Sequence, residues 1–185
     1  RAGVGHLGVP RENIHFLGLP DGGSGEIWHR HIDPSRPYLS VLLASDHAPY
    51  DALEKPNLPY ARKSVVEAAK DLIKRFKPDA IYTGHPDERH VDHRTNNWFV
   101  VKALQELQRE GEVSPNLKLF VDQSYGPGPQ KRAPYRYEKH ILNVPPEVWA
   151  RVQEAQWFYQ SQSGNRNLGK IRSFDQLPRQ EIHWQ

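Results

Sequence analysis

Cysteine and methionine are both absent from this chain of 185 residues. Without cysteine the protein has no disulfide framework, no thiolate metal site and no cysteine nucleophile, so any metal ion must be held by His, Asp or Glu. Long apolar runs are missing as well. The longest, residues 41–44 and 98–101, are far shorter than the roughly 20 residues that cross a bilayer. The sequence therefore predicts no membrane span.

A strong excess of one charge is also lacking. The chain has 25 Lys and Arg against 22 Asp and Glu, a net charge of +3, and this small excess gives no reason to expect a nucleic-acid partner. No G-x-S-x-G elbow, P-loop or G-x-G-x-x-G motif occurs, which removes support for serine hydrolases and nucleotide-binding proteins. The length fits one domain, so we expect a single domain over residues 1–185.

The chain begins at Arg1 and has no start residue. We therefore expect that residues precede Arg1 in the full-length protein and that they include the N-terminal part of the domain. A signal peptide would be lost with them, so a cytoplasmic location is only the default expectation. The sequence does not predict the oligomeric state.

Helical and strand patterns alternate along most of the chain. Apolar spacing, interrupted by Gly and Pro, predicts four strands and three helices. The strands cover residues 13–19, 79–83, 117–122 and 140–144, and the helices cover residues 61–76, 93–110 and 146–160. Residues 24–59 are expected to be irregular, and the tail, residues 163–185, to be coil. This order predicts an α/β protein with a three-layer α/β/α, Rossmann-like fold and a mostly parallel sheet, whose first strand or strands are missing from this chain.

In such folds ligands bind beyond the carboxyl ends of the strands, where this sequence places two loops. The first, residues 20–23, follows the first predicted strand. The second, residues 84–94, carries three His, two Asp and one Glu between His85 and His93. His90 and His93 stand three residues apart at a helix start, so their rings can point toward the same space. The cluster predicts a metal or catalytic site; the simpler alternative is a polar surface loop whose histidines cap the helix.

Residues 77–94, which contain the run H-P-D-E-R-H-V-D-H-R, resemble the second motif of the PIG-L/LmbE-like zinc deacetylases, a strand followed by H-P-x-D-x-H-P-D-H-R and a helix. Residues 17–22 resemble the family's L-G-x-x-D-G segment, and residues 159–162 resemble its late S-Q motif. The similarity extends over roughly residues 1–165. It implies a zinc-dependent enzyme that removes N-acetyl groups from N-acetylglucosamine-type sugars or related amides, which are small-molecule substrates.

The resemblance also implies roles for single residues. His93 corresponds to a zinc ligand, and His90 to the catalytic histidine that stabilises the tetrahedral intermediate or protonates the leaving amine. Asp92 corresponds to the catalytic carboxylate that hydrogen-bonds within this dyad. Asp21 and Arg94 correspond to substrate-binding positions. In such a site the zinc ion would polarise the acetyl carbonyl and activate a water molecule.

Two departures from the family pattern bear on activity. Val91 stands where the family has Pro, and the first motif, A-H-P-D-D-E, which supplies two zinc ligands and the general base, does not occur. The zinc site is therefore incomplete, and we expect the chain alone to be inactive. One alternative is an inactive sugar-binding or scaffold relative of the same fold. Another is a metallohydrolase of the metallo-β-lactamase type, although Glu88 stands where its H-x-H-x-D-H pattern needs the first His.

A second cluster of aromatic and basic side chains lies at residues 28–31, inside the stretch predicted to be irregular. Either it is an ordinary surface loop, or it covers the cleft and Trp28 stacks on a sugar ring.

Overall fold

A computed structural model describes residues 2–50, 54–122, 139–156, 158 and 180–184 of the chain. The chain divides into two compact units. The terminal unit consists of Arg1–His15 and His140–Ile182, and the central unit consists of Phe16–Lys139 and His183–Gln185. The two loops predicted to form the site, residues 20–23 and 84–94, both belong to the central unit.

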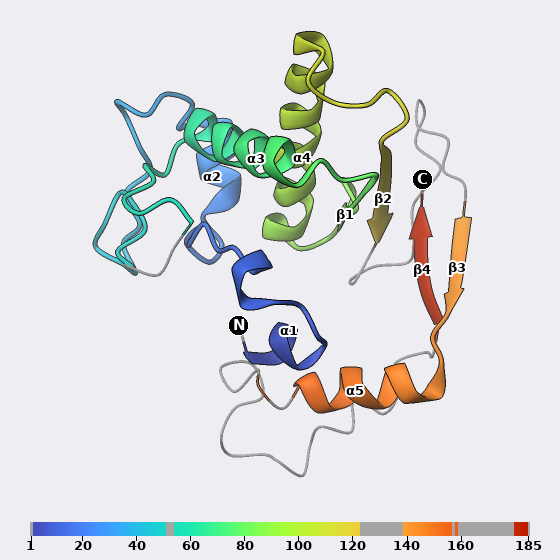
Figure 1. Cartoon of the computed structure of the whole chain (residues 1–185). Coiled ribbons are helices and arrows are strands. Elements are labelled where there is room, and N and C mark those ends of the chain that lie inside the picture. Colours follow the sequence, from blue (N-terminus) through green and yellow to red (C-terminus); the bar gives the residue numbers. More distant parts are fainter. Residues whose placement is uncertain (1, 51–53, 123–138, 157, 159–179, 185) are drawn as a thin grey trace. The chain divides into compact units, whose positions relative to one another are not determined.

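A β-α-β segment forms the middle of the central unit. Strand β1 (Ala80–Gly84) leads through a polar loop into helix α4 (Val91–Glu110), and β2 (Lys118–Asp122) follows (Figure 1). The two strands pair in parallel, from Ala80 opposite Lys118 to Gly84 opposite Asp122, and Val121 pairs antiparallel with Trp184. The predicted strands and the predicted helix are confirmed to within one or two residues at each end. The carboxyl ends of β1 and β2 therefore meet at one edge, beside the start of α4.

Helices α2 (Ser24–His29) and α3 (Arg62–Phe76) both pack against α4. Helix α3 was predicted almost exactly where it lies, and it ends at Lys77, whose left-handed backbone (φ 46°) precedes Pro78. Lys70 of α3 is buried, and its ammonium group donates a hydrogen bond to Glu110 of α4 at 2.8 Å. This ion pair links the two helices. The largest apolar side chains of the core come from these helices and the loop before α3: Ile27, Leu58, Tyr60, Val65, Val66, Ile73, Phe99, Leu104 and Leu107.

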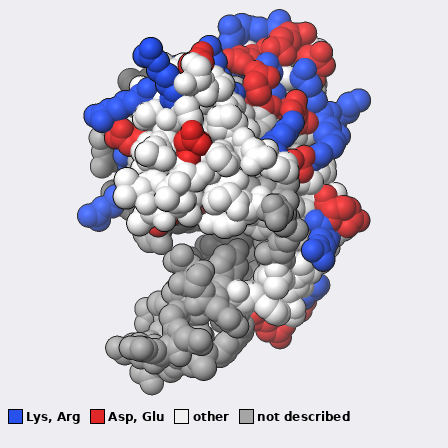
Figure 2. Space-filling view, turned by 90° about the vertical axis from the view of Figure 1, so that its left-hand side faces the viewer, with Lys and Arg blue, Asp and Glu red and all other residues white. Residues whose placement is uncertain are grey.

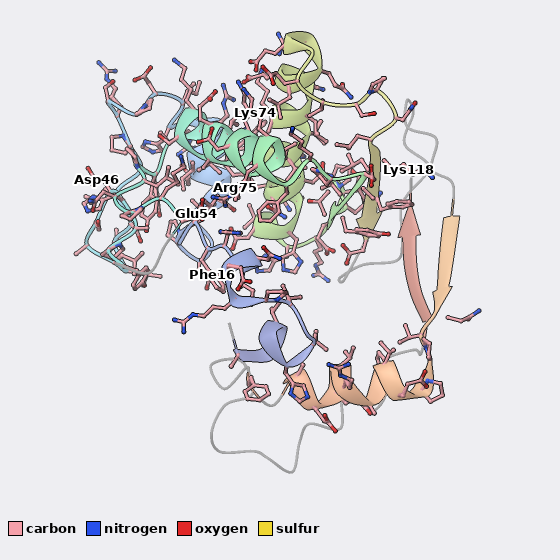
Figure 3. All side chains as sticks on the ribbon, viewed as in Figure 1. Phe16, Asp46, Glu54, Lys74, Arg75 and Lys118 are labelled. Atoms are coloured by element: carbon pink, nitrogen blue, oxygen red, sulfur yellow. The ribbon has the colours of Figure 1, made fainter. Side chains whose placement is uncertain are left out.

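The strand predicted over residues 13–19 is not present. The chain forms a short 3₁₀ helix, η1 (Arg11–Asn13), and then runs on without regular secondary structure. The Phe16 carbonyl accepts a hydrogen bond from the Glu54 amide at 3.0 Å, and the Glu54 side chain forms an ion pair with Arg75 of α3 at 2.8 Å (Figure 3). A strand exists only when a neighbouring strand pairs with it, and among the described residues none lies beside this segment. The apolar pattern was correct about partial burial and wrong about pairing.

Helix α2 was not predicted, because residues 24–59 lack helical periodicity. It has six residues, too few to show a repeating pattern, and an isolated helix of that length is not stable in water. Its stability comes from packing: Ile27 is fully buried in the core. The tertiary structure, and not the local sequence, decides its conformation.

The terminal unit contains α1 (Ala2–His6), η1, β3 (Lys139–Asn143) and α5 (Pro146–Gln156). Helix α1 packs on α5, where His6 contacts Glu154 at 2.9 Å and Arg151 donates to the His6 carbonyl. Helix α5 confirms the predicted helix as far as Gln156; residues 157, 159 and 160 of the predicted range lie outside the described residues. The tail was predicted to be coil, but β4 (Gln180–Trp184) is a strand beside β3; residues 163–179 lie outside the described part.

The chain thus has a mixed α/β structure with a small, open parallel pair of strands; the three-layer, Rossmann-like architecture stays a prediction. No helix in the described ranges is both long enough and apolar enough to cross a membrane. Figure 2 shows the face over the loops between α2 and α3, where few side chains are charged. There the apolar run at residues 41–44 forms a surface turn, with Val41 86% and Leu42 83% exposed.

Candidate functional site

The loop between β1 and α4 is anchored by His85. Its amide donates to the Asp122 carbonyl at 2.7 Å, and its Nδ1 accepts from the Asp87 amide at 3.0 Å. The side chain is fully buried. Burial lowers the pKa of His85 below its usual value, so the ring is neutral at pH 7. His85 shapes the loop from within.

His90 and His93 lie together at the start of α4. His90 is the N-cap residue, and its Nδ1 accepts a hydrogen bond from the Asp92 amide at 3.3 Å. The His90 and His93 rings have their centroids 4.7 Å apart. The His90 side chain is 44% exposed and His93 is half-buried, so neither ring is in the apolar core. The arrangement satisfies both interpretations of the sequence, since His90 caps the helix while its ring stays beside that of His93.

Asp92 connects this helix start to the loop that carries Asp21. Its carboxylate accepts from the Gly22 amide at 2.8 Å and from the Ser24 hydroxyl. By contrast, 3.9 Å separates it from the His90 Nδ1, which is too far for a hydrogen bond. Asp92 therefore joins two loops here, and a hydrogen bond within the histidine dyad stays a prediction.

Asp21 lies at the mouth of a pocket between the two loops. The pocket has a volume of about 260 Å³ and is lined by residues from both sides, among them Asp21, Asp92, Asn96 and Phe99. Gly22, with a φ of 70°, forms the turn that brings its amide to Asp92. The sequence predicted that Asp21 and the 84–94 loop lie at one edge of the sheet; the strand expected before Asp21 is absent, but Asp21 and Asp92 line the same pocket.

Arg94 turns back onto its own loop. Its guanidinium donates to the Arg89 carbonyl at 3.0 Å and to the Glu88 carbonyl at 3.4 Å. These contacts close the loop before α4 and give Arg94 a structural role. Contact between Arg94 and a substrate stays a prediction.

Gly84 permits a close approach of β1 to α4. A Cβ atom at this position would lie 2.7 Å from the His93 carbonyl oxygen, closer than any side chain tolerates. The end of the strand and the first turn of the helix are therefore in direct backbone contact. The local sequence gives no sign of this requirement, which arises from the packing of α4.

The described part of the chain does not gather enough metal donors at one place for a zinc site. Glu88 is 1% exposed, and its carboxylate accepts from the Arg89 amide at 2.9 Å. Among the residues that the structure describes, no group of three or more His, Asp or Glu side chains could hold a metal ion. The S-Q motif at residues 159–162 lies outside the described residues.

The comparisons with known proteins identify the family. A family model described as PIG-L, GlcNAc-PI de-N-acetylase, matches residues 1–104, which include both loops of the site. The chain belongs to the PIG-L family. No curated protein and no solved structure matches it. Membership of PIG-L indicates a hydrolase of the de-N-acetylase type, and the family is generally zinc-dependent.

Proposed function

We propose that this PIG-L chain carries part of the active site of a zinc-dependent hydrolase that removes the N-acetyl group from N-acetylglucosamine-type sugars or related amides. The observation that supports it most is the pair of imidazoles, His90 and His93, 4.7 Å apart at the start of α4, within the region that matches the family. The substrate named by the family is GlcNAc-PI, and its acetamido sugar is the group that we assign to this site.

Each residue of the site has a role in the proposal. His93 is the metal ligand. The His90 Nδ1 atom accepts a hydrogen bond from the Asp92 amide, so Nε2 carries the N–H of the ring in this tautomer. That N–H group can stabilise negative charge on the reacting carbonyl. Asp92 keeps the loop of Asp21 against α4, and Asp21 accepts from sugar hydroxyls at the pocket mouth. Arg94 closes the loop and contacts the substrate.

The histidines suit zinc in kind, because neutral imidazole is one of its preferred ligands, but not in number. A catalytic zinc has three protein ligands and an open position for water, and the described residues do not bring three together. Zinc, when bound, would supply an activated water and polarise the acetyl carbonyl. The further donors have to come from residues beyond those described.

Acetate release tests the proposal. The assay uses N-acetylglucosamine-type substrates and compares the 185-residue chain with a longer protein in which a strand carrying the first motif, A-H-P-D-D-E, is added before Arg1. We expect turnover from the longer protein alone, and its loss in His93→Ala. A longer protein that binds the sugar and zinc but releases no acetate would favour an inactive sugar-binding relative instead.

A further inference from the structure

A second pocket lies on the other side of α4. It has a volume of about 310 Å³, is open on one side, and is lined by residues of α4, β2, the end of α2 and the loop after β1. Successive residues of a helix are about 100° apart, so Asn97 and Val101 face away from Asp92 and Asn96, which line the Asp21 pocket. The lining of this second pocket includes Trp28, Pro86, Asn97, Trp98, Val101 and Val121.

Two indole rings form one wall, and both are held in place. The Trp28 ring meets Phe99 edge-to-face at 5.2 Å, and the Arg62 guanidinium lies 5.2 Å from its centroid. The Trp98 ring lies 5.7 Å from Trp28 and 5.5 Å from His29. These contacts fix the orientation of both rings before any ligand arrives, which lowers the entropy lost on binding.

Asn97 is a polar residue of the pocket lining whose side chain the fold does not use. The residue is only 3% exposed, yet its side-chain amide forms no hydrogen bond with any residue in the described ranges. Its amide atoms are not among the buried side-chain atoms that lack a partner, so the amide is open to the pocket, where water or a ligand can bind it. Since Asn97 lines the pocket, a ligand there can satisfy both its N–H donors and its carbonyl acceptor.

We propose that this pocket binds a sugar ring in the pyranose form. A pyranose has apolar C–H groups, which pack against the indole rings that line the pocket, and hydroxyl groups, which suit the amide. The volume and the mix of apolar walls with a few polar groups are those of small-molecule sites. Pro86 places the pocket beside the 84–94 loop, but the ring bound here needs no acetyl group. The inference is therefore independent of the deacetylase activity.

The test uses methyl β-D-glucopyranoside, which contains no amide that could be hydrolysed. In ¹⁵N-correlated NMR spectra of the intact chain, each of its five tryptophans contributes one indole N–H signal, and Trp→Phe variants assign them. We expect saturable shifts of the Trp28 and Trp98 signals and none of Trp149, which lies in α5. Absence of saturable shifts at Trp28 and Trp98 would overturn the proposal.

Two variants locate the site, with one control. Asn97→Ala removes the amide and should weaken binding about tenfold, the effect of losing one to two good hydrogen bonds. Val101→Phe fills the pocket without removing a polar group and should abolish the shifts. Val148→Phe, at a 44% exposed position of α5, should leave them unchanged. If Val101→Phe folds and still gives the wild-type shifts, the sugar binds elsewhere and the proposal is wrong.

Discussion

The two faces of helix α4 differ in how their polar groups are used. On one face, Asp92 accepts hydrogen bonds from Gly22 and Ser24, so this carboxylate is satisfied by the fold itself. On the other face, Asn97 is only 3% exposed, but its side chain has no hydrogen bond in the described part of the chain. A satisfied buried group stabilises a structure, whereas an unsatisfied one needs a ligand or water.

The difference separates two kinds of site on one helix. On the face of Asp92, the hydrogen bonds of this carboxylate hold the Asp21 loop beside the histidine pair. We call this contact the Asp92 junction. The face of Asn97 is a preformed cavity with fixed aromatic walls. Substitutions on the first face should therefore change stability, and substitutions on the second should change ligand binding.

The largest expected loss of stability follows from Asp92→Ala. The variant removes the acceptor for the Gly22 amide and the Ser24 hydroxyl, and hydrogen bonds to a charged group contribute about 1.5–3 kcal/mol each. We expect the free energy of unfolding to fall by about 3 kcal/mol in urea denaturation. Asp71→Ala, which breaks only an exposed ion pair with Lys55, should cost less than about 1 kcal/mol. Equal losses of unfolding free energy in the two variants would show that the hydrogen bonds of Asp92 do not stabilise the contact between the Asp21 loop and α4.

Gly84→Ala should have the next largest effect. The added methyl group would lie 2.7 Å from the His93 carbonyl oxygen, so the first turn of α4 must shift, at a cost of about 2 kcal/mol. The His90 and His93 ring signals in NMR spectra should move with it. Gly5→Ala in α1 is the control, because a Cβ there has nothing within 4 Å. Unchanged histidine signals in Gly84→Ala would contradict the contact.

The smallest effect concerns pH and His85. Burial lowers the pKa of His85 in the folded protein below the value of 6.5 that it has when exposed. Its contribution to stability is therefore complete above about pH 6.5 and is lost as the pH falls toward the folded-state pKa, with a slope of up to about 1.4 kcal/mol per pH unit. His85→Gln should remove that slope from the unfolding free energy measured between pH 7.5 and 5. His47→Gln, at a partly exposed position, should retain it.

The β-α-β segment could be predicted because its signals are local. Lys77 and Pro78 end one helix, Gly111 ends the next, and the apolar stripe between them repeats at helical spacing. The same local pattern placed the histidine pair at the start of α4. Residues 13–19 carry an equally clear apolar run, but strand formation depends on a partner that the run itself does not specify.

The contacts that assemble the site could not be predicted, because they join residues far apart in the sequence. Asp92 and Gly22 are 70 residues apart, and nothing near either residue indicates the other. The second pocket depends in the same way on Trp28 of α2 meeting Trp98 of α4. The sequence suggested a role for Trp28 in sugar stacking, but gave no reason to connect it with Asn97.

Zinc titration by calorimetry, on untagged protein, tests the central claim that His93 and His90 have different roles in one PIG-L site. Because the chain lacks a three-ligand group in its described part, it should bind zinc only weakly. His93→Ala should lower that affinity at least about tenfold, the expected result of losing one of few ligands. His90→Ala should leave it within about threefold, because its role lies in stabilising charge during the reaction. Tight, stoichiometric zinc in the wild-type chain, or equal losses in the two variants, would contradict the assignment.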